Sequence, residues 1–151
     1  MKECQIVIAG HDGLSLSASV VGPEDGAPVL LAHGGGQTRR AWRGVARLLS
    51  AHGFRAIALD MRGHGESSWA SNGAYCIHDF AEDLVAVARH LGERPHLIGA
   101  SLGGLAGLIA EGDIAPGTFS SLTLVDITPR MEAGGVDRIV GFMSAHAREG
   151  F

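Results

Sequence analysis

The sequence predicts an α/β fold: a mostly parallel sheet of about six strands that starts with an antiparallel hairpin and carries helices on both faces. Two observations predict this class. Short continuous apolar runs, typical of strands buried on both faces, alternate with amphipathic helical patterns. Glycine-rich or polar loops directly follow these runs, and in such sheets the carboxyl ends of the strands are where ligands bind.

The N-terminal hairpin is predicted from the runs 5–8 and 14–20, which flank Asp12-Gly13. The second run alternates apolar residues with serine, as a strand covered on one face does. Further strands are expected at 29–32, 56–59, 96–98 and 122–125, and helices around 42–49, 77–91 and 104–110. Residues 1–130 are therefore expected to form the core, and 131–151 the start of a cap or lid helix.

Composition describes one soluble globular unit: 151 residues, 46% hydrophobic, with a formal net charge of −4. The charge balance leaves no basic surplus for nucleic acid. The longest nearly uncharged stretch, 97–110, is too short and too glycine-rich to cross a bilayer. We expect a cytoplasmic protein with a small-molecule partner and no membrane or nucleic-acid partner.

Cofactors and metals are not indicated. Lys2 is the only lysine, which excludes a Walker-type phosphate loop and an internal Schiff base. The histidines show no metal-ligand spacing. Cys4 and Cys76 form no C-x-x-C motif and are expected to be buried small residues, although a disulfide between them is an alternative.

The sequence Gly99-Ala100-Ser101-Leu102-Gly103 has the pattern G-x-S-x-G between a predicted strand and a predicted helix. Glycines on both sides of the serine remove Cβ atoms that would collide where the chain reverses, so the hydroxyl stands exposed above the sheet. Ser101 is therefore a candidate nucleophile. The alternative is a tight turn with a solvated serine.

Four loops in register resemble those of the α/β-hydrolase superfamily. They are His33 to Gly36, Asp60 to Ser67, Gly99 to Gly104 and Leu124 to Asp126, each after a predicted strand. The match is most similar to the esterase, haloperoxidase-like and epoxide-hydrolase-like branch. A serine in the third loop implies cleavage of esters, lactones or related acyl compounds.

This resemblance implies roles for individual residues. Ser101 would attack the acyl carbon, and the N–H groups of Leu102 and Gly35 would form the oxyanion hole. His33 and Gly34 would lie at the substrate, and His33 and His64 would brace neighbouring loops. Residues of the second loop, Asp60, Arg62 and Glu66, would fix that loop.

The resemblance also implies a triad in the order serine, acid, histidine, with the histidine well beyond residue 151. The chain is therefore expected to be the N-terminal portion of a truncated α/β-hydrolase fold. Asp126 is either the triad acid or a structural or substrate-facing carboxylate. His146 could fold over the site or be a surface residue of the cap. Neighbouring arginines are expected to be solvated, although they could contact a substrate carboxylate: Arg39, Arg40 and Arg130.

The sequence is compatible with two functions. The first is a serine hydrolase that acts on small esters, and the second is a catalytically inactive hydrolase-like module that binds a small ligand or a partner chain. A nucleotide-binding domain is disfavoured because the glycine loop does not fit G-x-G-x-x-G. An apolar edge strand at 122–125 further predicts self-association through the exposed sheet edge.

Overall fold

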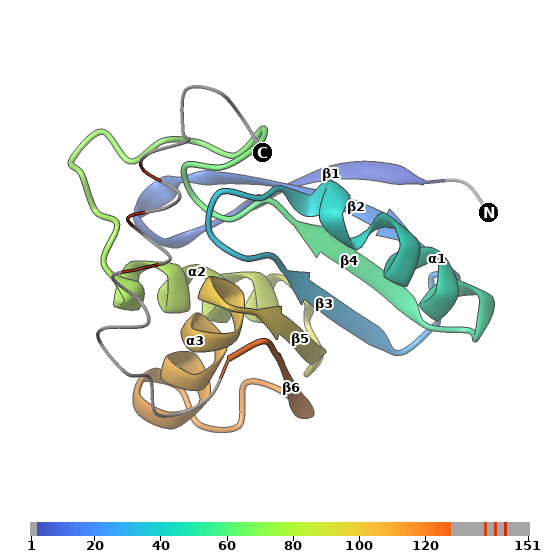
Figure 1. Cartoon of the computed structure of the whole chain (residues 1–151). Helices are drawn as coiled ribbons and strands as arrows, with labels where there is room; N and C mark the ends of the chain where they lie inside the picture. The colour runs from blue at the N-terminus through green and yellow to red at the C-terminus, as the bar shows by residue number, and fades with distance from the viewer. Residues whose placement is uncertain (1–2, 128–137, 139–140, 142–143, 145–151) are drawn as a thin grey trace.

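The computed structural model describes residues 3–127 and the single positions 138, 141 and 144 (Figure 1). Within this part of the chain, six strands form one sheet in the order β1-β2-β4-β3-β5-β6. The elements follow one another as β1 (Cys4–Ala9), η1 (His11–Gly13), β2 (Ser15–Val21), β3 (Pro28–Ala32), η2 (Arg39–Trp42), α1 (Arg43–Ala51), β4 (Arg55–Leu59), α2 (Ile77–Leu91), β5 (His96–Ala100), α3 (Leu102–Ile109), η3 (Ala110–Ile114) and β6 (Ser121–Val125).

The sheet has an antiparallel part and a parallel part. β1 pairs antiparallel with β2, and β2 pairs antiparallel with β4. The strands β4, β3, β5 and β6 are parallel to one another. The predicted fold class is therefore confirmed, and the loops after β3, β4, β5 and β6 meet at one edge of the sheet.

The N-terminal hairpin turns where the sequence predicts it. Asp12 and Gly13 both have positive φ, 56° and 75°. The turn is closed by the Gly10 N–H, which donates to the Leu14 carbonyl at 2.7 Å. Asp tolerates this conformation and Gly adopts it freely, which is why the pair favours a tight hairpin turn.

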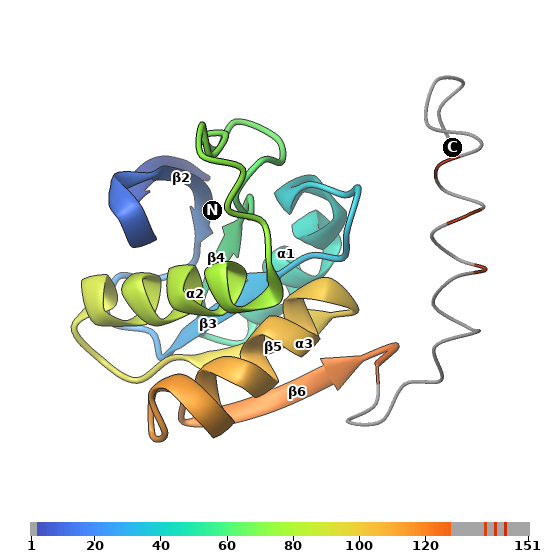
Figure 2. The same cartoon turned by 90° about the vertical axis from the view of Figure 1, so that its left-hand side faces the viewer.

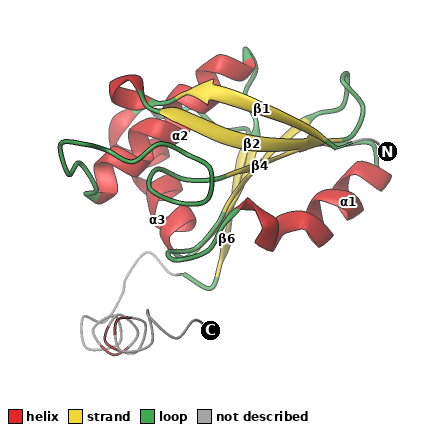
Figure 3. Cartoon of the chain, turned by 90° about the horizontal axis from the view of Figure 1, so that it is seen from above, coloured by secondary structure: helices red, strands yellow, loops and turns green. Residues whose placement is uncertain are grey.

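Helices cover both faces of the sheet. α1 lies on one face, and α2 and α3 lie side by side on the other (Figures 2 and 3). The larger core cluster fills the space beneath α2 and α3, with Leu30, Ile57 and Leu97 from the strands and Leu84 from α2. The smaller cluster lies beneath α1 and includes Trp42. These two apolar layers cover the two faces of the sheet.

Two helices differ in detail from the prediction. The helix expected around 42–49 is α1, and a 3-10 turn, η2, directly precedes it. After α3, the chain widens into the π-turn η3. Propensity patterns locate a helix but do not distinguish these hydrogen-bond variants at its ends.

The expectation that the cysteines are buried is wrong. Cys4 and Cys76 are both exposed free thiols. Cys4 starts the edge strand β1, and Cys76 is the N-cap residue of α2. Both positions lie at the ends of elements, where the apolar core does not reach.

Part of the predicted organisation lies outside the described residues. The expected cap helix over 131–151 falls there apart from three isolated positions, so its boundary at residue 130 stays a prediction. Arg130 and His146 lie outside the description as well. In the described part of the chain, no helix is both long and apolar enough to cross a membrane.

Candidate active site

Ser101 occupies a strained turn between β5 and α3. Its backbone has φ 44° and ψ −109°, a region that residues with a side chain rarely adopt. Such conformations cost about 1–3 kcal/mol and persist only where the surrounding structure enforces them. The serine is also exposed. The turn thus presents a hydroxyl at the carboxyl edge of the sheet.

The flanking glycines make this turn possible. A Cβ on Gly99 would lie 2.6 Å from the Gly103 carbonyl carbon, and a Cβ on Gly103 would lie 2.7 Å from the Ala32 carbonyl carbon. A Cβ on Gly104 would lie 2.8 Å from the Gly99 oxygen. The first turn of α3 therefore packs directly against β5 and β3, with no room for side chains. This close packing is the physical reason for the G-x-S-x-G pattern.

Hydrogen bonds anchor the turn to both neighbouring strands. The Ser101 N–H donates to the Val125 carbonyl of β6 at 3.0 Å, and the Gly103 N–H donates to the His33 carbonyl at 3.2 Å. The serine is consequently positioned by three strands of the sheet, not by the local turn alone.

The glycine turn after β3 lies against Ser101. A Cβ on Gly34 would be 3.6 Å from the Ser101 Cβ, and a Cβ on Gly35 would be 3.9 Å from the Leu102 Cδ2. The Gly34 N–H donates to Gln37 Oε1 at 3.1 Å, and the Gly36 N–H donates to His64 Nε2 at 3.1 Å.

The amides that the sequence singles out differ from their neighbours. Among residues 3–127, no acceptor takes a hydrogen bond from the N–H of Gly35 or of Leu102. Both amides belong to segments that flank Ser101. An oxyanion hole requires amides that are not already bonded within the protein, and the role of these two amides stays a prediction.

His33 is bonded through both ring nitrogens. It is fully buried, its Nδ1 donates to the Gly34 carbonyl at 2.7 Å, and its Nε2 accepts from the Met61 N–H at 3.1 Å. Burial lowers the pKa of His33 from its ordinary value of 6.5, against the opposing effect of the Gly34 bond. A bracing position of this kind agrees with the expectation, and its predicted substrate contact stays a prediction.

His64 is bonded in the same way. Its Nδ1 donates to the Arg62 carbonyl at 2.9 Å while its Nε2 accepts the Gly36 N–H. The His33 and His64 rings meet edge to face with centroids 5.0 Å apart. Neither histidine therefore has a free nitrogen with which to take a proton from Ser101.

Asp126 follows β6 directly and lies next to Ser101 in the register of the sheet. Ala100 pairs with Val125, so the two residues that follow these strands are neighbours at the carboxyl edge. Asp126 is exposed and has φ 53°, a second strained backbone position in this edge. Its predicted role as a triad acid stays a prediction.

The expectation that Arg39 is solvated is wrong. Only 5% of the Arg39 side chain is exposed, and its guanidinium forms an ion pair with the fully buried Asp60 and another with Glu66 at 2.7 Å. Asp60 also accepts the Glu66 N–H at 2.9 Å. Asp60 directly follows a buried strand, and a buried carboxylate needs a cationic partner. This position of Asp60 was the feature of the sequence that could have predicted a buried arginine. Arg40 is exposed as expected.

Arg62 has a partner that sequence reasoning missed. This arginine is fully buried and forms a two-pronged ion pair with Asp83 of α2, at 2.6 Å and 2.8 Å. It also donates to the Ala74 carbonyl at 2.9 Å. Asp83 lies on the apolar face of α2 beside Phe80 and Leu84. An acidic residue on an apolar helix face was the feature of the sequence that could have predicted a buried ion pair.

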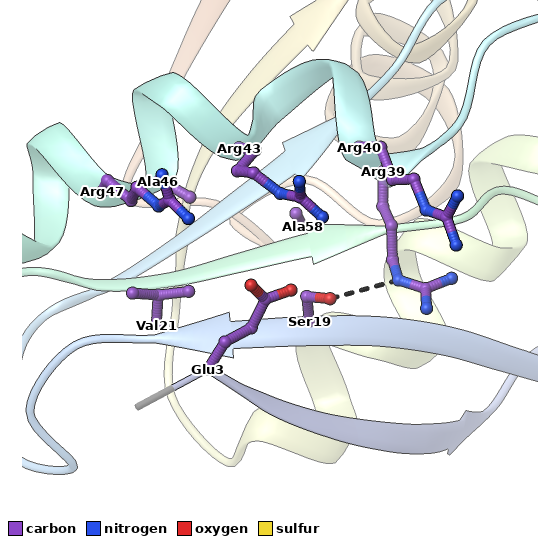
Figure 4. Close-up of a pocket in the computed structure, with 9 residues that line it drawn as sticks. All are labelled: Glu3, Ser19, Val21, Arg39, Arg40, Arg43, Ala46, Arg47 and Ala58. Atoms are coloured by element: carbon purple, nitrogen blue, oxygen red, sulfur yellow. Dashed lines mark hydrogen bonds between the residues drawn. The ribbon is translucent and has the colours of Figure 1, made fainter. Parts of the chain in front are cut away.

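The arginine-lined pocket between β2 and α1 is unsuited to an acyl group (Figure 4). Its cavity of about 20 Å³ holds about one water molecule. Four arginines and Glu3 contribute to its lining, and Arg39 closes one end by donating to Ser19 Oγ at 3.1 Å. Among the described residues, no three or more histidine, cysteine or acidic side chains are grouped to hold a metal ion.

Comparison with known proteins agrees with this geometry. Residues 27–146 match a family model described as the alpha/beta hydrolase fold. The chain therefore belongs to the α/β-hydrolase family. It is 38% identical over 102 residues to an esterase of Mycobacterium tuberculosis, a match that covers 67% of this chain and 33% of the esterase.

Two further relatives support the same assignment. A non-heme chloroperoxidase of Streptomyces lividans is 34% identical over 125 residues, which cover 81% of this chain and 44% of that protein. The crystal structure of an α/β hydrolase from Novosphingobium aromaticivorans superimposes with a TM-score of 0.81 at 28% identity, covering 93% of this chain and 50% of that one. The chain thus spans half or less of the length of these relatives.

Proposed function

We propose that this chain carries the nucleophile of a serine hydrolase that acts on small esters or related acyl compounds, with Ser101 as the attacking residue. The observation that carries the proposal is the strained backbone of Ser101 (φ 44°), enforced by glycines that contact β3 and β5. A solvated serine in an ordinary turn does not need such strain, whereas a nucleophile at a sharp strand-to-helix turn does.

The oxyanion hole is assigned to the N–H groups of Gly35 and Leu102. Attack on an acyl carbon places negative charge on the carbonyl oxygen, and fixed amides that already face it lower the barrier. Loss of one such donor typically costs about 3 kcal/mol of transition-state stabilisation. The two amides are free in the described residues and belong to segments that pack against each other beside the serine.

An acyl substrate is supported by the relatives. They include an esterase, a 3-oxoadipate enol-lactonase of Acinetobacter baylyi and a pimeloyl-[acyl-carrier protein] methyl ester esterase of Methylococcus capsulatus. Each of these names describes the cleavage of an ester or lactone bond. Asp126 is the carboxylate in the described residues that we assign to the triad, because it follows the strand next to Ser101.

A second function, ligand binding without hydrolysis, is favoured by one specific observation. His33 and His64, the histidines beside the site, both use their two ring nitrogens to bind backbone groups. Neither can act as the general base without breaking a bond to the glycine turn or to its neighbour loop. Without another base, a chain with these amides could bind a ligand oxygen but could not hydrolyse an ester.

Labelling with a fluorophosphonate probe separates these functions. We expect wild-type protein to be labelled at Ser101, Ser101→Ala to remain unlabelled, and Ser71→Ala, which changes an exposed serine of the loop after β4, to behave as wild type. Mass spectrometry of the labelled peptide identifies the serine. A folded wild-type chain that stays unlabelled under conditions that label a known serine hydrolase would overturn the hydrolase proposal for this chain and support the binding function.

A further inference from the structure

Two histidines beside the site are held in one protonation state by their partners. A backbone carbonyl only accepts a hydrogen bond and a backbone N–H only donates one. Because Nδ1 of both His33 and His64 faces a carbonyl, each Nδ1 carries a proton. Because Nε2 of each ring faces an N–H, each Nε2 must be unprotonated. Both rings are therefore neutral Nδ1–H tautomers.

The two histidines cross-link the loops reciprocally. His33, at the end of β3, holds Met61 at the start of the loop after β4. His64, within that loop, holds Gly36 in the turn after β3. The turn that contains Gly35 is therefore held on one side by Gln37 and on the other by His64.

We propose that His64 is a positioning residue for the oxyanion turn: its neutral ring holds Gly36, and hence the Gly35 amide, beside Ser101, and protonation of the ring releases the turn. A proton on Nε2 would point at the Gly36 N–H, so a favourable bond becomes a repulsive contact. The catalytic consequence rests on the proposed function, whereas the bond itself does not.

The two rings lie in different surroundings. Asp60 raises the pKa of His33, the Arg62 backbone carbonyl accepts the bond from His64, and α2 contributes the uncharged Phe80, whose ring centroid lies 6.4 Å from that of His64. Asp60 and Arg62 are each paired elsewhere, with Arg39 and Asp83. Burial lowers the pKa of His33, and a charge on either histidine disfavours a charge on the other. His64, by contrast, is only partly buried.

The burial of His33 also makes the free energy of unfolding depend on pH. The folded-state pKa of His33 lies below its ordinary value of 6.5, so the unfolded chain binds more protons than the folded chain as the pH falls. The stabilising contribution of neutral His33 is therefore complete above about pH 6.5 and is lost progressively below it. Acid thus weakens the cross-link through His33.

NMR of the histidine rings tests the proposal without substrate. In the wild-type chain at pH 8, long-range ¹H–¹⁵N correlations should show both rings as Nδ1–H tautomers. On lowering the pH to 5, the Gly36 amide should lose about tenfold in exchange protection, as expected when one hydrogen bond is lost. The midpoint should coincide with that of the His64 ring. An Nε2–H tautomer of His64 at pH 8 would overturn the proposal.

Matched variants separate His64 from general acid effects. In His64→Gln, whose amide oxygen accepts a bond but does not titrate in this range, the pH-dependent step at Gly36 should disappear. His90→Gln, at an exposed position near the end of α2, should retain it. Persistence of the step in His64→Gln would overturn the proposal. If the probe labels Ser101, lowering the pH should reduce the labelling of the wild-type chain more than that of His64→Gln. If Ser101 is not labelled but both rings are Nδ1–H tautomers, the hydrolase proposal is rejected and the proposed cross-link through His64 is not.

Discussion

At the scale of single residues, glycine is required where the backbone of one element touches that of another. Gly103 and Gly44 illustrate the difference, because each is the second residue of a helix, α3 and α1 respectively. A Cβ on Gly103 would overlap the Ala32 carbonyl, whereas a Cβ on Gly44 would meet nothing within 4 Å. The helical pattern alone does not distinguish them.

The two alanine variants should therefore change stability in opposite directions. Gly103→Ala should destabilise the protein by roughly 2–3 kcal/mol, because a backbone contact must open. Gly44→Ala should be neutral or stabilise it by up to about 1 kcal/mol, since alanine favours the helix. Urea unfolding at pH 7 measures both. Equal effects of the two substitutions would contradict the packing argument.

At the scale of elements, buried ion pairs connect loops to helices. Asp83 of α2 binds Arg62 from the loop after β4 and also accepts the His11 N–H of η1 at 2.8 Å. One carboxylate thus joins three segments. Such a pair adds little net stability compared with apolar packing, but removal of one partner leaves a buried charge without compensation.

Asp83→Asn tests this connection. The amide can still accept from His11, but the Arg62 guanidinium loses its two-pronged partner and keeps the longer ion pair with Asp79, at 4.0 Å, so we expect a loss of about 3 kcal/mol in the free energy of unfolding. Glu93→Gln is the control. It breaks the ion pair with Arg55 at a position that is 52% exposed and should cost less than about 1 kcal/mol. A small effect of Asp83→Asn in the same urea titration would contradict the inferred role.

At the scale of the whole molecule, β6 is an edge strand of the sheet formed by residues 3–127. It pairs with β5 on one side, and its sequence from Ser121 to Val125 carries no charge. Val125 is 40% exposed. Edge strands without charges, prolines or bulges tend to pair with another chain.

We therefore expect this chain to self-associate through β6 as its concentration rises. Val125→Lys should shift light-scattering masses toward the monomer, because a charged edge opposes strand pairing. Leu48→Lys is the control, since it removes an equally apolar side chain, 61% exposed, from α1. A monodisperse wild-type monomer at high concentration would refute the expectation.

Local patterns predicted much of the fold and part of the site. The apolar runs predicted the strands, since burial on both faces requires continuous apolar sequence. The glycines around Ser101 predicted a sharp turn, which the structure contains. The positive φ of Asp126 was not predicted, because aspartate tolerates this conformation but no glycine stands beside it to mark a turn, as one does at Asp12.

The order of elements and the loops at the carboxyl edge follow from the sequence. The spacing of apolar residues and the positions of glycines determine local structure over a few residues, whatever the rest of the chain does. The tertiary structure decided the partners: Arg39 with Asp60, Arg62 with Asp83, His33 with Met61, and His64 with Gly36. These pairings join segments about 20 or more residues apart. They depend on strand order and register, which bring charges and ring nitrogens together in space and which no local pattern encodes.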